Sequence, residues 1–344
     1  MIKAIYKKYI LNFKSPSGTS RGILRTKETW FVIIEENGKK GIGETGLFRG
    51  LSSDDVPDYE EKLNWVCKNI NLGLEDLLAE VFNFPSIQFG LEQAFLSLQS
   101  EHQFELFPSA FTKGNQAISI NGLVWMGDQQ FMKSQIEEKL KTGFSCIKMK
   151  IGAIDFEAEL RLLKSIRKEF LANEIELRVD ANGAFNPENA LDKLKKLSEL
   201  DIHSIEQPIK QGQLQEMASL CESTPLPIAL DEELIGIFSL DEKKKIIETI
   251  NPQFIILKPS LVGGFRGSKE WIEILDKQTN WWITSALESN VGLSAIAQFT
   301  HTLKNELPQG LGTGSLFTNN FESPLEVKNG TLQYNASKIW NFNI

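Results

Sequence analysis

Five short apolar runs that each end in a charged residue decide the fold of this chain: CIKMK (146–150), ELRVD (176–180), SIE (204–206), PIALD (227–231) and FIILK (254–258). Their last residues are 30, 26, 25 and 27 positions apart. That spacing is the length of one strand, one turn and one helix of about a dozen residues. The repeat therefore predicts parallel strands joined by crossover helices.

Three further runs extend this pattern toward both ends of the chain. One precedes the five, at 117–121, and two follow them, at 282–285 and 309–311. Segments with helical spacing of apolar residues separate the runs, for example 156–170 and 189–200. Eight runs of this kind predict an α/β fold, a modified TIM-like (β/α)-barrel.

The residues before the barrel have a different pattern. Two alternating stretches, 2–13 and 27–36, predict a β-hairpin whose connection, 14–22, is rich in turn-forming residues. Apolar residues at helical spacing follow over 58–103. We therefore expect an α+β capping domain at 1–113 and a barrel at 114–314. Residues 315–344 leave no room for another unit and are expected to complete the capping domain.

Composition restricts the partners of the chain. The net charge of −8 argues against nucleic acid and against an anionic membrane surface, because both attract clustered Lys and Arg. The N-terminus lacks the apolar run of a signal peptide, and no window approaches about 20 apolar residues. Three scattered cysteines are too few for a disulfide framework or a zinc site and are typical of a reducing cytoplasm. The oligomeric state is not predicted.

The charged run-ends are candidate functional residues. In a parallel barrel all carboxyl ends of the strands lie at one face, where barrel active sites are built. A single charged residue there needs no explanation beyond solvation, but five successive ones, in this order, are hard to explain that way. Lys148 and Arg178 share the side of the strand with two of them, because side chains two apart point the same way. The five are Lys150, Asp180, Glu206, Asp231 and Lys258.

Three carboxylates on one narrow rim require a cation among them, since they otherwise repel each other and raise each other's pKa. A hard divalent ion with oxygen ligands, Mg²⁺, fits such a set. Lysines on both flanks indicate acid–base chemistry on a small-molecule carboxylate substrate. A metal ion can then stabilise the enolate that forms when the α-proton is removed.

The motifs that contain these residues resemble those of a known family. KMK (148–150), VDAN (179–182), EQP (206–208), DE (231–232), LKPSLVGG (257–264) and SALES (285–289) resemble the muconate-lactonising subgroup of the enolase superfamily. Within it, SRG (20–22), KETW (27–30), GLS (50–52) and GLGTGSLF (310–317) are similar to the o-succinylbenzoate synthase family of menaquinone biosynthesis. The resemblance covers nearly the whole chain.

This resemblance implies a lyase mechanism. Lys150 would remove the α-proton of a cyclohexadiene carboxylate and, as the ammonium, protonate the departing hydroxyl group. Lys258, on the opposite side, would stabilise the enolate, and Lys148 would support Lys150. The Mg²⁺ ligands, for which Mn²⁺ would be a substitute, would be Asp180, Glu206 and Asp231.

The resemblance also implies the pocket around these groups. Loops of the capping domain near Arg21 and at Phe48–Leu51 would exclude water and set specificity. The barrel residues expected to contact substrate are Arg178, Asn182, Ser285 and Glu288.

Other functions remain open or are disfavoured. An N-acylamino-acid racemase or another epimerase of the subgroup would use the same lysines and metal, and a non-catalytic barrel scaffold would use neither. A dipeptide epimerase typically carries an Asp-x-Asp pair where this chain has GLGTGSLF, and a sugar-acid dehydratase uses a histidine where it has SALESN. None of the histidines, at 102, 203 and 301, ends a predicted strand, so histidine-based nucleophilic catalysis is unsupported.

Overall fold

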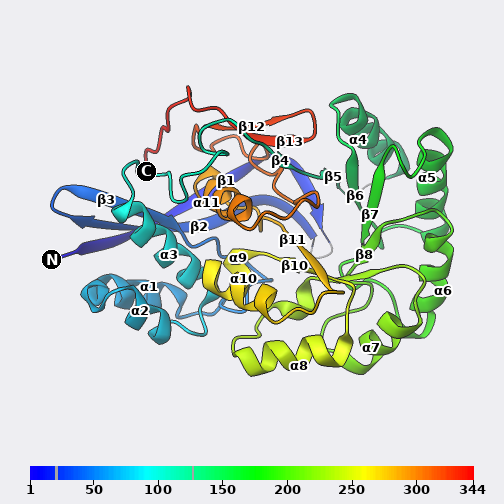
Figure 1. Cartoon of the computed structure of the whole chain (residues 1–344), viewed down its shortest axis with the longest axis horizontal. Helices are drawn as coiled ribbons and strands as arrows, with labels where there is room; N and C mark the ends of the chain where they lie inside the picture. Colours follow the sequence, from blue (N-terminus) through cyan, green and yellow to red (C-terminus); the bar gives the residue numbers. More distant parts are fainter. Residues whose placement is uncertain (20–21, 126–127) are drawn as a thin grey trace.

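A computed structural model describes residues 1–19, 22–125 and 128–344. An antiparallel sheet and a group of helices occupy the N-terminal side, and a curled parallel sheet with outer helices occupies the other (Figure 1). The class expected from the sequence, an α/β barrel with an N-terminal α+β unit, is confirmed. In the described part of the chain, no helix combines the length and the apolar character needed to cross a membrane.

The N-terminal sheet has three antiparallel strands, β1 (Lys3–Thr19), β2 (Gly22–Glu36) and β3 (Lys39–Glu44). The expected connection at 14–22 was largely wrong, because β1 and β2 continue pairing to Thr19 and Gly22 after a register shift between Asn12 and Ser17. The turn-forming residues at 14–16 are exposed. Arg21, a predicted substrate contact, lies outside the described residues.

Four helical segments cover this sheet: α1 (Tyr59–Lys68), η1 (Ile70–Leu72), α2 (Leu74–Glu80) and α3 (Pro85–Gln99). Helix α3 lies directly on β3. The contact is so close that a Cβ atom at Gly43 would come within 1.9 Å of the carbonyl oxygen of Gly90. Trp30, Leu63, Leu77 and Leu91 are fully buried in the core between these elements.

The barrel sheet contains seven parallel strands in the order β11-β10-β9-β8-β7-β6-β5. Their bounds are β5 (Gly122–Val124), β6 (Cys146–Lys150), β7 (Glu176–Asp180), β8 (Ser204–Glu206), β9 (Ile228–Leu230), β10 (Phe254–Leu257) and β11 (Asn280–Ile283). The predicted run at 309–311 closes the barrel through single bridges, Gln309 to Ile120 and Gly310 to Thr284. The run predicted at 117–121 is displaced: β4 (Ile118–Ser119) pairs elsewhere and β5 begins at Gly122.

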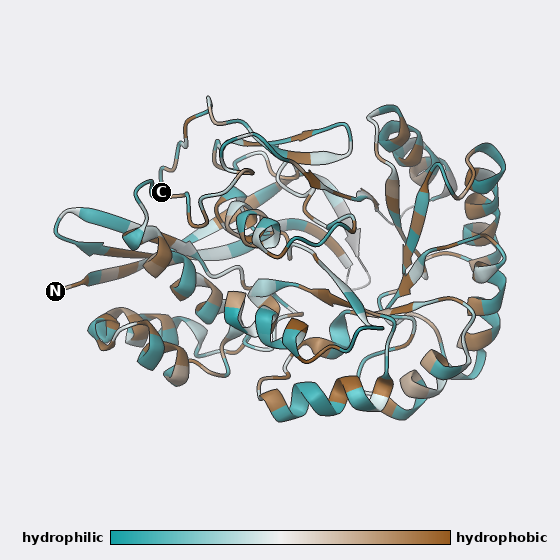
Figure 2. Cartoon of the chain, viewed as in Figure 1, coloured by the Kyte–Doolittle hydropathy of each residue, from teal (hydrophilic) through white to brown (hydrophobic). Residues whose placement is uncertain are grey.

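Helices on the outside of the barrel connect its strands. They are α4 (Gln129–Lys141), α5 (Phe156–Glu169), α6 (Pro187–Ser198), α7 (Leu214–Ser223), η2 (Glu232–Leu234), α8 (Leu240–Ile250), α9 (Pro259–Val262), α10 (Gly264–Glu273) and α11 (Asn290–Thr302). Figure 2 shows the outer helices striped with hydrophobic and hydrophilic residues. In α5 the stripe is Leu160, Leu163 and Ile166, which are buried against the sheet.

The C-terminal segment runs back across both parts of the molecule. Its strands β12 (Leu325–Lys328) and β13 (Thr331–Tyr334) form a sheet with β4. Phe317 bridges to Phe13 of β1, and Phe342 packs on Phe31 of β2. These contacts agree with a C-terminal segment that supports the capping domain, although the division at residue 113 stays a prediction.

Candidate active site

One pocket lies at the carboxyl ends of the barrel strands and is covered by the N-terminal unit. Phe48 and Leu51, from the loop after β3, line it together with the ends of β5 to β8 and the segments after β10 and β11. The loop is held by its own hydrogen bonds, for example from the backbone N–H of Phe48 to Ser52 Oγ at 2.8 Å. Its apolar side chains therefore form one wall of a preformed pocket.

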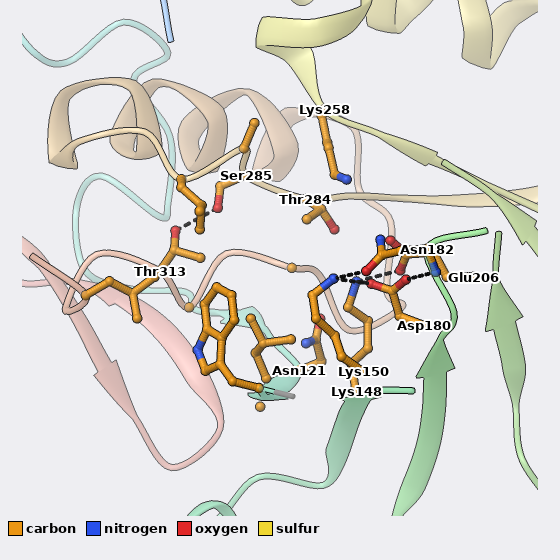
Figure 3. A pocket seen from close by; sticks show the side chains of 18 of the residues that line it. Asn121, Lys148, Lys150, Asp180, Asn182, Glu206, Lys258, Thr284, Ser285 and Thr313 are labelled. Atoms are coloured by element: carbon orange, nitrogen blue, oxygen red, sulfur yellow. Dashed lines mark hydrogen bonds and ion pairs between the residues drawn. The ribbon is translucent and has the colours of Figure 1, made fainter. Parts of the chain in front are cut away.

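Strand register brings Lys150, Asp180 and Glu206 together, with Lys148 beside them. Lys150 of β6 is level with Asp180 of β7, which is level with Glu206 of β8. Lys150 Nζ donates to Asp180 Oδ2 at 2.9 Å, and Lys148 Nζ donates to Asp180 Oδ2 at 3.0 Å and to Glu206 Oε2 at 2.5 Å. Because each strand ends at the same height, single residues from three strands meet at one point (Figure 3).

The remaining pair approaches from the next strands. Asp231 follows β9, and Lys258 follows β10 and donates a short hydrogen bond to Asp231 Oδ2. Lys258 extends toward the centre of the pocket from the side opposite to Lys148 and Lys150 (Figure 3). The pocket therefore has an ammonium group on each flank and carboxyl groups between them.

Burial and neighbouring charges shift the pKa values of these groups in different directions. Burial, reinforced by Asp180, raises the pKa of Glu206 to about 8. Burial also raises the pKa of Asp231, despite Lys258 beside it. For Asp180 burial acts in the same direction, but Lys148 and Lys150 outweigh it and hold the pKa below its usual range. Asp180 is thus fully charged, whereas the negative charges of Glu206 and Asp231 are poorly compensated by their surroundings.

The lysines show the complementary effect. Burial acts to lower the pKa of Lys148, but Asp180 and Glu206 outweigh it, so the pKa is raised. The pKa of Lys258 is raised in the same way, by Asp231 and Glu206 against burial. Both side chains therefore carry their positive charge in this arrangement.

The carboxyl groups retain unused acceptor capacity that suits a hard cation. Glu206 Oε1 is buried and, within the described residues, has no hydrogen-bond partner, while its carboxyl group adjoins that of Asp231. Adjoining acceptor oxygens with no donor between them are costly unless a proton or cation joins them. No group of three acidic, histidine or cysteine side chains in the described ranges is spaced to hold a metal as it stands. Lysines bind Asp180 Oδ2, Glu206 Oε2 and Asp231 Oδ2, and the backbone N–H of Asn182 donates to Asp180 Oδ1, so an ion would have to replace some of these contacts.

Asn182 lies in the pocket, as expected for a substrate contact. Its left-handed backbone, with φ of +44°, turns the chain sharply after β7. Its Oδ1 accepts from Lys150 Nζ at 2.6 Å, and its Nδ2 donates to Glu232 Oε1 at 3.0 Å. The amide thus fixes the position of the Lys150 ammonium group.

Two of the other predicted contacts do not reach the pocket. Arg178 is stacked on Trp282 at 4.2 Å and donates to Glu176 Oε1 at 2.6 Å, toward the amino end of its strand. Glu288 is buried behind the pocket wall, where it accepts from Ser260 Oγ at 2.5 Å. The expectation that these two side chains line the pocket is therefore corrected. Alternation along a strand gives the face on which Arg178 lies but not how deep its side chain reaches. The position of Glu288 within a motif does not give the direction in which its side chain points. Ser285, by contrast, does line the pocket and hydrogen-bonds Thr313 at 2.6 Å.

Several lining residues escaped the sequence prediction. They carry no charge, and only Asn121 among them ends a predicted run, so no signal other than their place on a strand marked them. Asn121 and Trp125 would have been found by alternation with Leu123, had the strand been placed correctly. The missed residues are Asn121, Trp125, Phe144, Thr284 and Thr313.

The chain is similar to known proteins in sequence and in fold. Residues 132–337 match the family described as enolase C-terminal domain-like. The o-succinylbenzoate synthase of Desulfotalea psychrophila (strain LSv54 / DSM 12343) is 46% identical over 359 residues, which cover 95% of this chain and 97% of that protein. The crystal structure of MenC from Desulfotalea psychrophila LSv54 superposes with a TM-score of 0.86 at 42% identity and covers 96% of this chain and 99% of that one. The L-Ala-D/L-Glu epimerase of Bacillus subtilis (strain 168) is 26% identical over 341 residues, covering 94% of this chain and 89% of that protein.

Proposed function

Because this chain belongs to the enolase superfamily and, within it, to the o-succinylbenzoate synthase family, we propose that it is a lyase that dehydrates 2-succinyl-6-hydroxy-2,4-cyclohexadiene-1-carboxylate to o-succinylbenzoate. The observation that carries the proposal is that Lys150 and Lys258 lie on opposite sides of one pocket, where Asp180 binds Lys150 and Asp231 binds Lys258. That arrangement can remove a proton on one side and stabilise the resulting charge on the other.

Lys150 performs the acid–base work in this proposal. As the neutral amine it takes the proton from the carbon next to the ring carboxylate. The resulting ammonium gives that proton to the hydroxyl group as its C–O bond breaks, so water leaves and a new ring double bond forms. The product ring is aromatic, which makes the elimination strongly favourable. Asn182 holds the Lys150 Nζ atom in place through its 2.6 Å hydrogen bond.

Lys258 and Lys148 remain charged. Lys258 faces the pocket from the opposite side, where its ammonium group stabilises the negative charge of the enolate. Lys148 is buried and bound to two carboxylates, so it holds the site together and places a second positive charge near Lys150. A neighbouring cation favours the neutral form of a lysine, which is the form that a base requires.

Mg²⁺ is part of the proposal, because members of the superfamily generally use it. Asp180, Glu206 and Asp231 would hold the ion, and the unpartnered Oε1 of Glu206 fits that role. When bound, the ion supplies Lewis-acid stabilisation to the substrate carboxylate. Mn²⁺ would be a substitute. We place the reaction in the cytoplasm, in keeping with the three free cysteines.

A racemase of N-acylamino acids is the second candidate. The lysines on both flanks could each exchange one proton at the same carbon, and the chain is 26% identical to an L-Ala-D/L-Glu epimerase. The 46% identity to an o-succinylbenzoate synthase favours dehydration as the main activity.

A direct assay distinguishes the candidates. The purified protein is incubated with Mg²⁺ and either the succinyl-cyclohexadiene acid or an N-succinyl amino acid, and o-succinylbenzoate formation and optical rotation are followed. The proposal expects dehydration with a kcat/KM at least about tenfold above that of racemisation, a difference of about 1.4 kcal/mol in the barrier. Racemisation without dehydration would replace the proposal with the second candidate.

A further inference from the structure

A buried polar cluster joins the N-terminal unit to the barrel directly behind the pocket wall. Lys27 of β2 and Glu44 of β3 come from one side, and Ser260 and Glu288 come from the other. Glu288 is fully buried and Lys27 is 6% exposed. Lys27 Nζ donates to the carbonyl oxygen of Gly46 at 3.4 Å.

Burying the side chain of Lys27 in this position costs free energy, because its charge loses contact with water. Burial lowers its pKa, and only the charges of Glu44 and Glu288 act in the opposite direction. The pKa of Glu288 is raised by burial, against the influence of Lys27 and of its hydrogen bond from Ser260. A buried lysine opposite a buried carboxyl group adds little net stability, because desolvation offsets attraction. A role in fixing the geometry of neighbouring residues explains the buried Lys27 better than a role in stability.

The neighbouring structure that needs to be held in place is the wall of the pocket. Ser285, Ala286 and Leu287 line the pocket, and Leu287 has a left-handed backbone with φ of +63°. For a residue with a branched side chain that conformation costs about 1–3 kcal/mol and must be held by its surroundings. Glu288 holds it, because its Oε2 accepts from the backbone N–H of Ala286 at 2.7 Å.

The two parts of the molecule meet closely at this point. A Cβ atom at Gly46, whose φ is +71°, would lie 2.9 Å from Ser260 Cβ and 3.2 Å from Glu288 Cγ. Gly46 is two residues before Phe48, which also lines the pocket. The cluster is therefore close in sequence to two segments that line the pocket, the one at Phe48 and the one at Ser285–Leu287.

We propose that Lys27 is a positioning residue for substrate binding: from the N-terminal unit it holds the carbonyl group of Gly46, which packs against Ser260 and Glu288, and in this way it keeps Glu288 and the Ser285–Leu287 wall of the pocket in place. Lys27 does not touch the substrate, and the acid–base groups do not depend on it. The inference rests on the proposed dehydration, because its effect is measured on that substrate.

The test compares Lys27→Met, Glu288→Gln and the double variant with a matched control, Lys243→Met. Lys243 is also a buried lysine, 2% exposed and bound to Glu270 at 2.6 Å, but it does not line the pocket. The KM, kcat and melting temperature are measured for each. We expect KM to rise about tenfold in each single variant with kcat within about threefold of wild type, and we expect the control to lose thermal stability with KM unchanged.

The double variant separates positioning from general damage. It removes both charges, and the glutamine can still accept from the Ala286 N–H, so we expect its KM to fall below that of either single variant. KM effects that multiply in the double variant, or an unchanged KM in Lys27→Met, would overturn the proposal. If Lys27→Met does not fold, an unchanged KM in Glu288→Gln overturns it. Wild-type protein without dehydration activity would refute the proposed function instead.

Discussion

The molecule has two buried groups of carboxylates. One lies at the barrel mouth and the other lies between the two parts of the molecule, and their charges are balanced in different ways. At the interface, Glu44 accepts from the N–H groups of Ser289 and Gly292 at 2.9 Å each, at the start of α11. Glu92 accepts from the N–H groups of Phe265 and Arg266 at the start of α10. Both therefore bind helix N-termini, where free N–H groups and the helix dipole favour a negative charge.

At the barrel mouth most of the donors are side chains instead. Lys148, Lys150 and Lys258 donate to the carboxyl groups, the backbone N–H of Asn182 donates to Asp180 Oδ1, and one oxygen of Glu206 has no partner in the described structure. Backbone N–H groups cannot move away, whereas lysine side chains can exchange partners when a substrate or cation arrives. The interface thus relies on backbone donors that stay in place, together with a few hydroxyl groups, whereas the site relies mainly on lysines that can change partners. Four substitutions test this difference.

The largest effect is expected for Lys150→Ala. Loss of the proposed base should lower kcat by at least about 10³-fold, because positioned acid–base groups typically contribute 10²–10⁴-fold. Steady-state kinetics measure it, and circular dichroism with thermal melting should show a folded protein. Activity above a few per cent of wild type would remove Lys150 from the role of base.

Glu44→Ala tests the fixed region. The substitution leaves two backbone N–H groups and the hydroxyl groups of Thr29 and Ser289 without their buried acceptor. Breaking a buried charged network of this kind costs about 3–5 kcal/mol in the free energy of unfolding. Chemical denaturation measures the loss. A cost under about 1 kcal/mol, the scale of an exposed pair, would show that water replaces the carboxylate easily.

Glu206→Gln tests the exchangeable region. Mg²⁺ affinity by calorimetry should fall at least about 100-fold, since even residues behind a ligand typically contribute 10–100-fold. The metal-free protein should change little in stability near pH 7, because with a pKa of about 8 Glu206 is mostly uncharged there. Equal Mg²⁺ affinity in variant and wild type would exclude Glu206 as a ligand.

The smallest effect concerns pH and Glu92. Burial raises the pKa of Glu92 from 4.5 to about 7, against the helix N–H groups that it binds. Since the folded-state pKa exceeds the unfolded one, its contribution is complete below about pH 4.5 and is lost as the pH rises through about 7. Relative to Glu92→Gln, wild-type unfolding free energy should fall by about 1–3 kcal/mol between pH 5 and 8. A constant difference across that range would show that Glu92 does not titrate there.

The sequence predicted that the charged residues at the ends of the strands lie near one another, because strand ends of a parallel barrel share one face; their roles stay a proposal. The sequence did not predict the direction in which two of the side chains point. Arg178 is on the correct side of β7, yet its long side chain turns back toward Glu176. Glu288 follows the left-handed Leu287, which no local pattern announces. Both errors come from placing a side chain by its Cα position alone.

The fold was predicted less evenly. The strands from β6 to β11 were found because an apolar run between polar turns is a strong signal. The first barrel strand was placed too early, since β4 and β5 are adjacent in sequence and only their partners, β13 and β6, distinguish them. The pairing of β4 joins Ile118 to Leu332, which is distant in the chain, and is not a local property of the sequence.

The most direct test of the account is anomalous diffraction from crystals grown with Mn²⁺, which replaces Mg²⁺ and scatters anomalously. The account predicts one strong peak bounded by Asp180, Glu206 and Asp231, with Lys150 and Lys258 on either side of it. A peak bound by other residues, or no peak at Mn²⁺ concentrations that support turnover, would contradict it.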